Sequence, residues 1–329
     1  MTTKVAVLCG GVGAARFLRG LLAVTDPADV TGIVNVGDDS VIHGLNVSPD
    51  LDTITYTLAE AVNPETGWGL TGETWQAMEQ LRRYATANGR TAGDRIGDEA
   101  AGWFALGDRD LGTHLYRTSR LRDGALLGEV TSEITRAWGL ELCLTPVTDD
   151  PVRTRVTTAD GRDLSFQEYF VREHHQVEVT GVRYEGIEDA RRTLLVVVTL
   201  INADVIVIAP SNPVVSIEPV LGVPGVRAAV TERRDRTVAV SPIVGGAALK
   251  GPADRLLREL GHEPTVVGVA RWYSDVAGTL VIDEVDAHLA DAVEAEGMRC
   301  VVTPTVMSDP ATAAALATTC IRAATDARP

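Results

Sequence analysis

Residues 5–16 read VAVLCGGVGAAR, an apolar run that leads directly into three glycines. An amphipathic run follows, so the pattern predicts a buried strand, a tight turn and a helix. Glycine permits a positive φ and lets a ligand approach the backbone amides, and a helix N-terminus favours phosphate. We therefore interpret Gly10, Gly11, Val12 and Gly13 as a phosphate-binding turn. The alternative interpretation is a packing turn within an α/β sheet.

A second strand is expected at residues 30–36, which completes a β-α-β unit and predicts a parallel sheet. Asp38, Asp39 and His43 follow it in a turn-rich segment. An acid at this place holds a ribose in dinucleotide-binding proteins, so a dinucleotide oxidoreductase is one alternative. Against it, Arg16 stands where the dinucleotide fingerprint has its third glycine, and no hydride-transfer constellation is evident. A solvated turn is the simplest interpretation of the acids.

Residues 48–53 read SPDLDT and open a helical run. Ser48 is a suitable N-cap, and the proline after it suits the first helical position. Asp50 and Asp52 then fall in the first turn, where acids commonly complement the helix dipole. The other interpretation is metal ligation, because Mg²⁺ usually takes one or two carboxylates and leaves its other positions to water and substrate phosphates.

The composition argues against several classes of protein. A formal net charge of −15 disfavours nucleic-acid binding, which needs basic surface. Only Lys4 and Lys250 are lysines, so a phosphate clamp is expected to be built from arginine. No apolar run approaches the roughly 20 residues that span a bilayer. The first strand begins too early to leave room for a signal peptide, and the four cysteines form no metal or disulfide pattern, so we expect a cytoplasmic protein.

Residues 62–140 contain Trp68, Trp75 and Trp103 and are expected to form a small helical insertion. The tryptophans form either its core or a platform for a flat ring system. Arg109 lies between two acids in the motif GDRD and forms either a surface ion pair or a substrate clamp. The second acid of that motif is expected to cap the next helix.

The second half of the chain alternates between helices and short apolar runs. Residues 152–158 and 177–182 predict an antiparallel excursion from the main sheet. A buried strand is expected at residues 204–209, and further strands of the same sheet are expected at residues 238–240, 266–269, 280–282 and 300–302. Ser211 and Asn212 follow one of these strands, at the carboxyl end where open α/β sheets bind ligands.

Seven motifs occur in one order along the chain: GGVGAARFL, VNVGDD, IHGL, SPDLDT, LGDRD, APSNPVVSI and SPIVGG. Together they resemble the CofD/FbiA family, the 2-phospho-L-lactate transferases of coenzyme F-420 biosynthesis. The resemblance extends from residue 4 to about residue 310. It implies a single transferase domain over residues 1–329, with a Rossmann-like, mostly parallel α/β sheet and the helical insertion at about residues 62–140.

The resemblance also implies a reaction, a transfer of a substituted phosphate group assisted by Mg²⁺. In the family, the terminal ribityl hydroxyl of the deazaflavin Fo (7,8-didemethyl-8-hydroxy-5-deazariboflavin) attacks a guanosine-diphosphate-activated three-carbon acid, and GMP leaves. The form VGAARFL resembles the actinobacterial branch, whose donor carries phosphoenolpyruvate rather than phospholactate and whose product is dehydro-F-420-0. The sequence alone leaves the identity of the acid open. A homodimer is expected, with no membrane partner.

Residue roles follow from the same resemblance. Asp50 and Asp52 would lie at the metal or the Fo hydroxyl, and Arg109 would contact Fo or the incoming phosphate; these are the expected catalytic residues. The diphosphate would lie against the glycine loop at residues 10–13. The remaining substrate-binding residues would be Asp38, His43, Ser211, Asn212, Ser241 and Ile243.

Two points stay open in the sequence. Residues 86–102 are longer than expected for the family, which puts the contacts around Fo in question. A non-catalytic regulator of the YvcK type, which shares the glycine loop and binds nucleotide sugars, is the main alternative function. The motifs SPDLDT and GDRD favour the transferase, because they suit a site for Fo and a metal.

Overall fold

The computed structural model describes residues 2–89 and 103–326. The strands are β1 (Val5–Cys9), β2 (Val30–Val34), β3 (Ser40–Ile42), β4 (Leu45–Val47), β5 (Cys143–Pro146), β6 (Arg153–Thr158), β7 (Asp163–Ser165), β8 (Val179–Glu185), β9 (Val205–Ile208), β10 (Thr237–Val240), β11 (Ile243–Val244), β12 (Ala247–Ala248), β13 (Thr279–Ile282) and β14 (Arg299–Val302). The helices are α1 (Gly11–Leu22), α2 (Pro49–Leu58), α3 (Gln76–Ala87), α4 (Asp110–Arg122), α5 (Leu127–Ala137), α6 (Leu194–Asn202), α7 (Glu218–Gly222), α8 (Val226–Thr231), α9 (Ala253–Glu259), α10 (Val266–Tyr273), α11 (Ala290–Ala295) and α12 (Pro310–Thr325). Short 3-10 or π-helical turns are η1 (Pro27–Asp29), η3 (Glu168–Arg172), η4 (Pro213–Ile217), η5 (Arg234–Arg236) and η6 (Glu284–Leu289).

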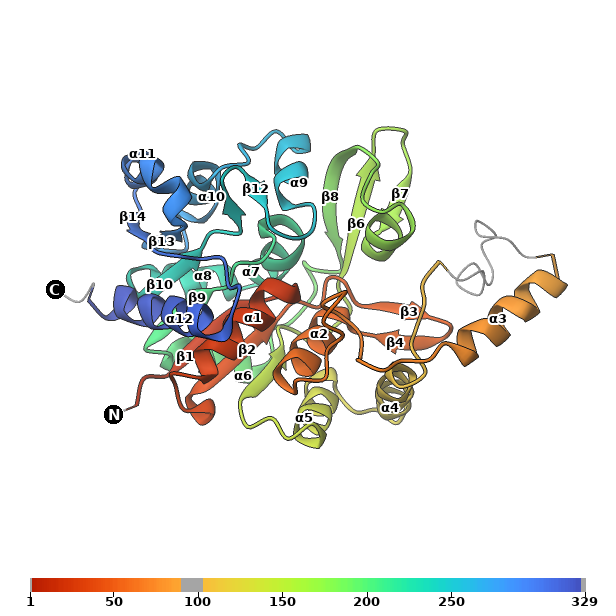
Figure 1. Ribbon diagram of the computed structural model, residues 1–329. Helices are drawn as coiled ribbons and strands as arrows, with labels where there is room; N and C mark the ends of the chain where they lie inside the picture. Colours follow the sequence, from red (N-terminus) through yellow and green to blue (C-terminus); the bar gives the residue numbers. More distant parts are fainter. Residues whose placement is uncertain (1, 90–102, 327–329) are drawn as a thin grey trace.

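A parallel sheet forms the centre of the part of the chain that the structure describes (Figure 1). Its seven strands lie in the order β14-β13-β10-β9-β1-β2-β5. The chain runs from β1 to β2 and β5 on one side, then returns to place β9, β10, β13 and β14 on the other. Val5 accordingly pairs with Val30 on one neighbour and with Val205 on the other. The strand order therefore reverses between β1 and β9, and open α/β sheets bind ligands at such a point.

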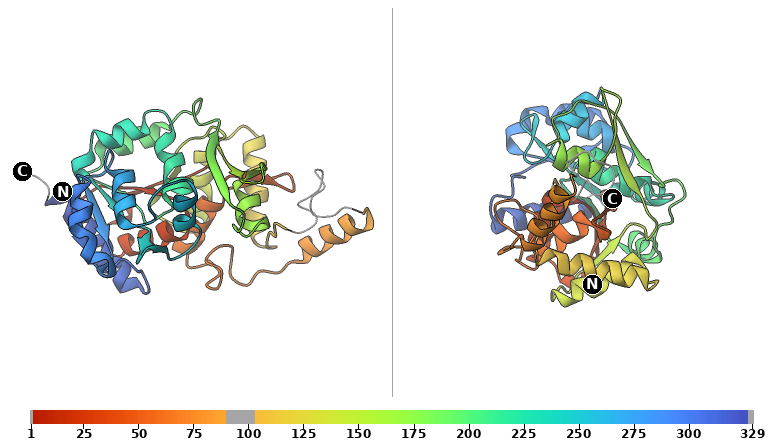
Figure 2. Two further views of the ribbon diagram at one scale, coloured as in Figure 1. Left: turned by 90° about the horizontal axis from the view of Figure 1, so that it is seen from above. Right: turned by 90° about the vertical axis from the view of Figure 1, so that its right-hand side faces the viewer.

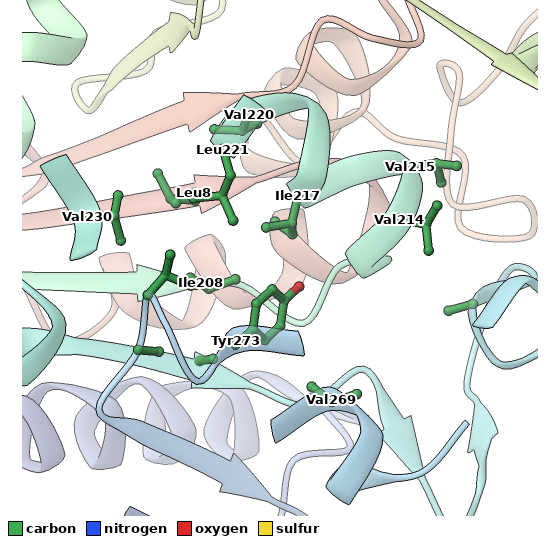
Figure 3. Packing of buried hydrophobic residues seen from close by; sticks show 14 of the residues in the cluster. Leu8, Ile208, Val214, Val215, Ile217, Val220, Leu221, Val230, Val269 and Tyr273 are labelled. Carbon is green, nitrogen blue, oxygen red and sulfur yellow. The ribbon is translucent and has the colours of Figure 1, made fainter. Parts of the chain in front are cut away.

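Both faces of this sheet are buried, which explains why its strands are continuous apolar runs rather than alternating ones. Along β1, Val5, Val7 and Cys9 belong to the core shared with α1 and α12, whereas Ala6 and Leu8 face α6, α7, α8 and α10. Figure 3 shows this second core, with Leu8 of β1 among side chains of the covering helices. The predicted Rossmann-like α/β fold is confirmed.

The helices α3, α4 and α5 lie between α2 and β5, in the segment expected as a helical insertion. Figure 2 shows α3 projecting away from the sheet and its covering helices. Asp108 caps α3, since its carboxylate accepts hydrogen bonds from the backbone N–H groups of Gln76 and Ala77, each at 3.0 Å. Most of the unusually long segment 86–102 lies outside the described residues, because the description stops at residue 89 and resumes at 103.

One expected strand is wrong. Residues 266–269 form the first turn of α10 instead, because the Thr265 hydroxyl accepts a hydrogen bond from the Gly268 N–H at 3.3 Å and caps the helix. A short apolar run of valines does not distinguish a buried strand from a buried helix. The other expected strands are confirmed as β9, β10, β13 and β14, of which β14 is only partly buried at the edge of the sheet, and the antiparallel excursion is confirmed as the sheet β7-β6-β8. No helix in the described ranges is long and apolar enough to span a membrane.

The contact between α1 and α12 gives a stability prediction. A Cβ on Gly20 would lie 2.4 Å from the backbone carbonyl carbon of Ala313, which cannot move without shifting α12. We expect Gly20→Ala to lower the free energy of unfolding by about 2 kcal/mol through overpacking. The matched control is Gly112→Ala in α4, where a Cβ would meet nothing within 4 Å. There alanine should raise the free energy by about 0.5–1 kcal/mol. Urea unfolding measures both; equal effects of the two substitutions would contradict the packing argument.

Candidate active site

The glycine loop and the turn after β9 meet at the carboxyl ends of β1 and β9. The Ser211 hydroxyl donates a hydrogen bond to the Gly10 carbonyl at 2.7 Å. A Cβ on Gly13 would lie 2.2 Å from the Pro210 carbonyl oxygen, and Gly11 has a φ of +72°. These positions therefore require glycine for packing and for backbone conformation. The same geometry leaves the first N–H groups of α1 at the ligand-binding edge of the sheet, as a phosphate site requires.

Asp50 reaches this loop from the first turn of α2. Its Oδ2 would lie 2.5 Å from a Cβ on Gly10, and it accepts a hydrogen bond from Asn35 Nδ2 at 2.9 Å. Asn35, at the end of β2, also accepts a hydrogen bond from the Gly37 N–H at 2.7 Å and so fixes the loop that carries Asp38. Asn35 was missed in the sequence analysis, although its position directly after a strand is a signal that could have identified it.

Asp38 and Asp50 form a pair of buried carboxylates. Burial raises the pKa of Asp38 well above its usual range, and the charges of Asp50 and Asp39 raise it further. Burial also raises the pKa of Asp50, to about 6, against the lowering effect of the hydrogen bond from Asn35. Asp38 Oδ1 is buried and has no hydrogen-bond partner among the described residues. The pair therefore concentrates negative charge that a bound cation would neutralise.

Asp39 continues this acidic group toward the surface. The Ser48 hydroxyl donates a hydrogen bond to Asp39 Oδ2 at 2.7 Å. Ser48 is the N-cap residue of α2 and Pro49 follows at the first helical position, as expected, but the Ser48 hydroxyl bonds to Asp39 and makes no side-chain capping bond. Burial raises the pKa of Asp39 to about 7, and this hydrogen bond opposes the increase. Within residues 2–89 and 103–326, no three or more His, Cys, Asp or Glu side chains converge on one metal position.

Asp52 has a different environment from Asp50, although both lie in the first turn of α2. Both Asp52 oxygens accept hydrogen bonds from the Arg117 guanidinium of α4, through Nη2 and, at 3.1 Å, through Nη1. The Arg117 side chain is 2% exposed, so this bidentate pair is buried. Arg117 was not identified as a site residue from the sequence, because nothing local marks an arginine 65 positions away as the partner of Asp52.

A polar network extends from this pair along α4. Arg117 Nη1 lies 3.3 Å from His114 Nδ1; the guanidinium can only donate, so this ring nitrogen accepts. His114 Nε2 then carries the proton and faces Asp110 Oδ2 at 3.2 Å. Asp110 also accepts a hydrogen bond from the Tyr56 hydroxyl at 2.6 Å. The network therefore joins α2 to α4 and fixes the orientation of Asp52.

Arg109 lies at the start of α4, and His43 lies in the turn between β3 and β4. The Arg109 guanidinium donates to the Thr71 carbonyl, so it ties together two parts of the helical segment. The helix cap expected from Asp110 comes instead from Glu73, which accepts the N–H groups of Arg109 and Asp110 at 2.8 and 2.9 Å. His43 has a φ of +52° at the tip of the β3–β4 hairpin, which points away from α1 (Figure 1).

Asn212, Ser241 and Ile243 form turns at the carboxyl edge of the sheet. Asn212 Oδ1 accepts the Val214 N–H at 2.9 Å and caps η4. The Ser241 hydroxyl donates to the Ile243 carbonyl at 2.9 Å and accepts the Ile243 N–H at 3.1 Å. These bonds fix the conformation of the turn after β9, which contains Asn212, and of the turn after β10, which contains Ser241 and Ile243. The structure therefore brings Ser211 and Asn212 to the same edge of the sheet as the glycine loop and Asp50.

A cavity of about 560 Å³ opens beside Asp38 and Asp39. Its size lies within the usual range of about 300–1,000 Å³ for small-molecule sites. The lining residues are Gly37, Asp38, Asp39, Ser40, Val41, Ile42, Trp103, Arg153, Thr154, Arg155, Ser165, Phe166, Gln167, Glu168 and Arg172. The Arg172 guanidinium lies 5.8 Å from the ring centroid of Trp103. The cavity thus combines an acidic end with aromatic and arginine side chains suited to a flat polar ligand.

The two acids of α2 should respond differently to neutralisation. Asp52→Asn removes the charge that compensates the buried Arg117, so we expect the free energy of unfolding to fall by about 3 kcal/mol. Asp50→Asn removes a charge that burial disfavours. At pH 7.5 we therefore expect the free energy of unfolding of this variant to equal or exceed that of the wild type. Chemical denaturation of the two variants measures this contrast; equal destabilisation would contradict the assigned environments.

Comparisons with known proteins agree with this architecture. The family model described as 2-phospho-L-lactate transferase CofD matches residues 5–320. A phosphoenolpyruvate transferase from Streptomyces griseus subsp. griseus is 42% identical, over 99% of each chain. Proteins of the same name from Nocardia farcinica and Mycobacterium avium are 40% and 41% identical to this chain. Each match covers 94% of this chain, together with 92% of the Nocardia protein and 96% of the Mycobacterium protein.

A solved structure has a similar fold. It is a member of the UPF0052 family from Bacillus halodurans, with a TM-score of 0.60 at 16% identity, over 98% of this chain and 99% of that chain. This likeness concerns the fold alone. The sequence matches cover the glycine loop, the acids of α2 and the turns after β9 and β10, and they show that the chain belongs to the CofD family of 2-phospho-L-lactate transferases.

Proposed function

We propose that this protein transfers a phospho-three-carbon acid from a guanosine-diphosphate-activated donor to the ribityl hydroxyl of Fo and releases GMP. One observation carries the proposal: of two buried carboxylates, Asp50 lies against the glycine loop at the N-terminus of α1, and Asp38 lines a cavity of about 560 Å³. The printed name of the relatives, phosphoenolpyruvate transferase, favours phosphoenolpyruvate as the acid. The product is then dehydro-F-420-0.

The donor would occupy the point where the strand order reverses. Its diphosphate would accept hydrogen bonds from the first N–H groups of α1, where the helix dipole also favours negative charge. Its guanosine part would extend along the turns after β9 and β10, which contain Ser211, Asn212, Ser241 and Ile243. This orientation leaves the acid-bearing phosphate toward Asp50.

Magnesium fits the carboxylates on the β2 and α2 side of the loop. Asp38 Oδ1 is buried without a partner among the described residues, and the pKa of Asp50 is raised to about 6 by burial. Two such carboxylates match the small number of protein ligands that Mg²⁺ commonly uses beside substrate phosphates. We therefore propose Asp50 with Asp38, rather than Asp52, as the metal ligands, because Arg117 engages both Asp52 oxygens. When bound, the ion would neutralise charge on the diphosphate.

The chemical step requires the ribityl hydroxyl to be aligned with the phosphorus atom and a base to accept the hydroxyl proton. The ribityl oxygen attacks phosphorus as the bond to the GMP oxygen breaks, and the hydroxyl proton passes to a base. Asp39 is the proposed base: it lines the cavity, its Oδ1 lacks a partner in the described ranges, and its pKa is raised to about 7 by burial. Asp52 would act as a positioning residue through the Arg117 network, and Arg109 as an anchor of the insertion.

The cavity would bind Fo, with the deazaflavin ring toward Trp103 and Phe166 and the ribityl chain toward Asp38. Its aromatic and arginine lining supports this orientation.

We also propose a homodimer and a cytoplasmic location, as the resemblance implies. The homodimer is supported by α6, on which Leu194, Val198 and Ile201 are 77%, 47% and 62% exposed.

The decisive experiment is GMP release when Fo is added to the phosphoenolpyruvyl donor and Mg²⁺. We expect release to stop with EDTA and to fall at least about 100-fold in Asp50→Ala, because neutralisation of charge at the phosphate is then lost. Gly112→Ala serves as the folded control. Mass spectrometry of the product identifies the acid. Binding of a uridine-diphosphate sugar without Fo binding or GMP release would instead support the regulator.

Trp103 tests the acceptor cavity. Trp103→Ala should raise KM for Fo about 10-fold, since a stacked ring is worth roughly 1–1.5 kcal/mol, and should leave the donor KM unchanged. Trp75→Ala is the matched control, since Trp75 is 44% exposed and lies outside the cavity lining. Steady-state kinetics with each substrate varied measures both constants. An unchanged KM for Fo in Trp103→Ala would exclude this cavity as the ring site.

A further inference from the structure

Lys250 lies beside the glycine loop, although it is distant from it in sequence. It follows the β11–β12 hairpin, and its Nζ donates a hydrogen bond to the Thr66 carbonyl at 2.9 Å. A Cβ on Gly67 would lie 2.7 Å from Lys250 Nζ and 3.5 Å from Val12 Cγ1. The ammonium group and the side chain of Val12 therefore contact the same glycine, at the mouth of the proposed phosphate site.

The segment that carries these contacts passes beside Val12, in the first turn of α1. Val62 and Leu70 form an isolated antiparallel bridge, and we name residues 62–70 the strap. Trp68 of the strap lies 5.8 Å from Lys250 Nζ and packs edge-on against Phe170 at 6.3 Å. Lys250 uses one of its three N–H donors on the strap, which leaves two donors for a ligand.

A second cation faces the same place. Arg16 is one helical turn after Val12 on α1, so the two side chains lie on one face of the helix. Partial burial lowers the pKa of the Lys250 ammonium, and the positive charge of Arg16 lowers it further, although both side chains are exposed to solvent. Among the described residues, neither forms an ion pair with a carboxylate.

We propose that Arg16 and Lys250 form an anion clamp that holds the diphosphate of the nucleotide donor against the amides of the glycine loop. The identity of the nucleotide rests on the function proposed above; the clamp itself rests on the two unpaired cations beside Val12. Like charges held together favour an anionic ligand, and a diphosphate supplies enough oxygens for the helix amides and both side chains. The phosphate clamp is therefore mixed, rather than built from arginine alone. Since Lys250 also binds the strap, a bound diphosphate would fix the strap over the site.

Nucleotide affinity tests the clamp. Isothermal titration calorimetry with GDP, GMP and guanosine should show that Lys250→Ala weakens GDP binding about 10- to 100-fold, as expected for loss of a charged hydrogen bond. Arg16→Ala should weaken it about 10-fold. Guanosine binding should change less than 3-fold, and Lys250→Arg should retain most of the GDP affinity. Lys4→Ala is the matched control, because Lys4 is the other lysine and precedes β1 at the opposite edge of the sheet.

Wild-type affinity for GDP in Lys250→Ala would overturn the clamp. An equal loss of affinity for GDP and for guanosine would also overturn it, because the loss of a phosphate contact cannot weaken the binding of a ligand that has no phosphate. Failure of the wild type to bind GDP would overturn the proposed donor and not the clamp, which inorganic pyrophosphate then tests in the same variants.

Amine labelling of the wild type gives a readout that does not depend on the folding of a variant. The chain has two lysines, so mass spectrometry can follow each ε-amine separately during acetylation. GDP, or pyrophosphate if GDP does not bind, should slow acetylation of Lys250 at least about 5-fold and leave Lys4 unchanged. Equal rates at Lys250 with and without a bound anion would overturn the proposal.

Discussion

The rest of the structure depends on the close approach of the glycine loop to the chain that leaves β9. A Cβ on Gly13 would lie 2.2 Å from the Pro210 carbonyl oxygen, and the Ser211 hydroxyl is hydrogen-bonded to the Gly10 carbonyl. This contact is possible only because β1 and β9 are neighbours in the sheet, at the point where the strand order reverses. It brings a helix N-terminus, a polar turn and the acids of α2 to one edge.

The acids at that edge differ in their partners, although they are neighbours in the sequence. Asp50 and Asp52 are two positions apart on α2, yet only Asp52 has a buried arginine, Arg117, on its carboxylate. Asp50 is bonded to a neutral amide and lies near Asp38, so folding leaves its charge uncompensated. A buried charge that lacks a partner costs stability, and such sites are typically kept for ligands.

The helical segment between α2 and β5 supports the site from one side. Tyr56, Asp110 and His114 connect α2 to α4 and lead to Arg117. The charged groups of this network face partners of opposite charge or hydrogen-bond donors, so the network sets the orientation of α2 without placing an unpaired charge in the core. The first turn of α2 can therefore present Asp50 toward the glycine loop in a fixed direction.

The sequence by itself determined the parallel α/β sheet, the glycine turn before α1 and the first-turn acids of α2, because strand burial, turn conformation and helix starts are local properties. It failed at residues 266–269, where a valine run was equally compatible with a helix, and at Asp110, whose expected role as a helix cap is taken by Glu73. Only the tertiary structure decided that Asp52 is paired with Arg117, that Asp38 and Asp50 share a desolvated position, and that Lys250 lies beside Val12. Those relations join residues that are distant in the chain, and strand order sets them rather than any local pattern.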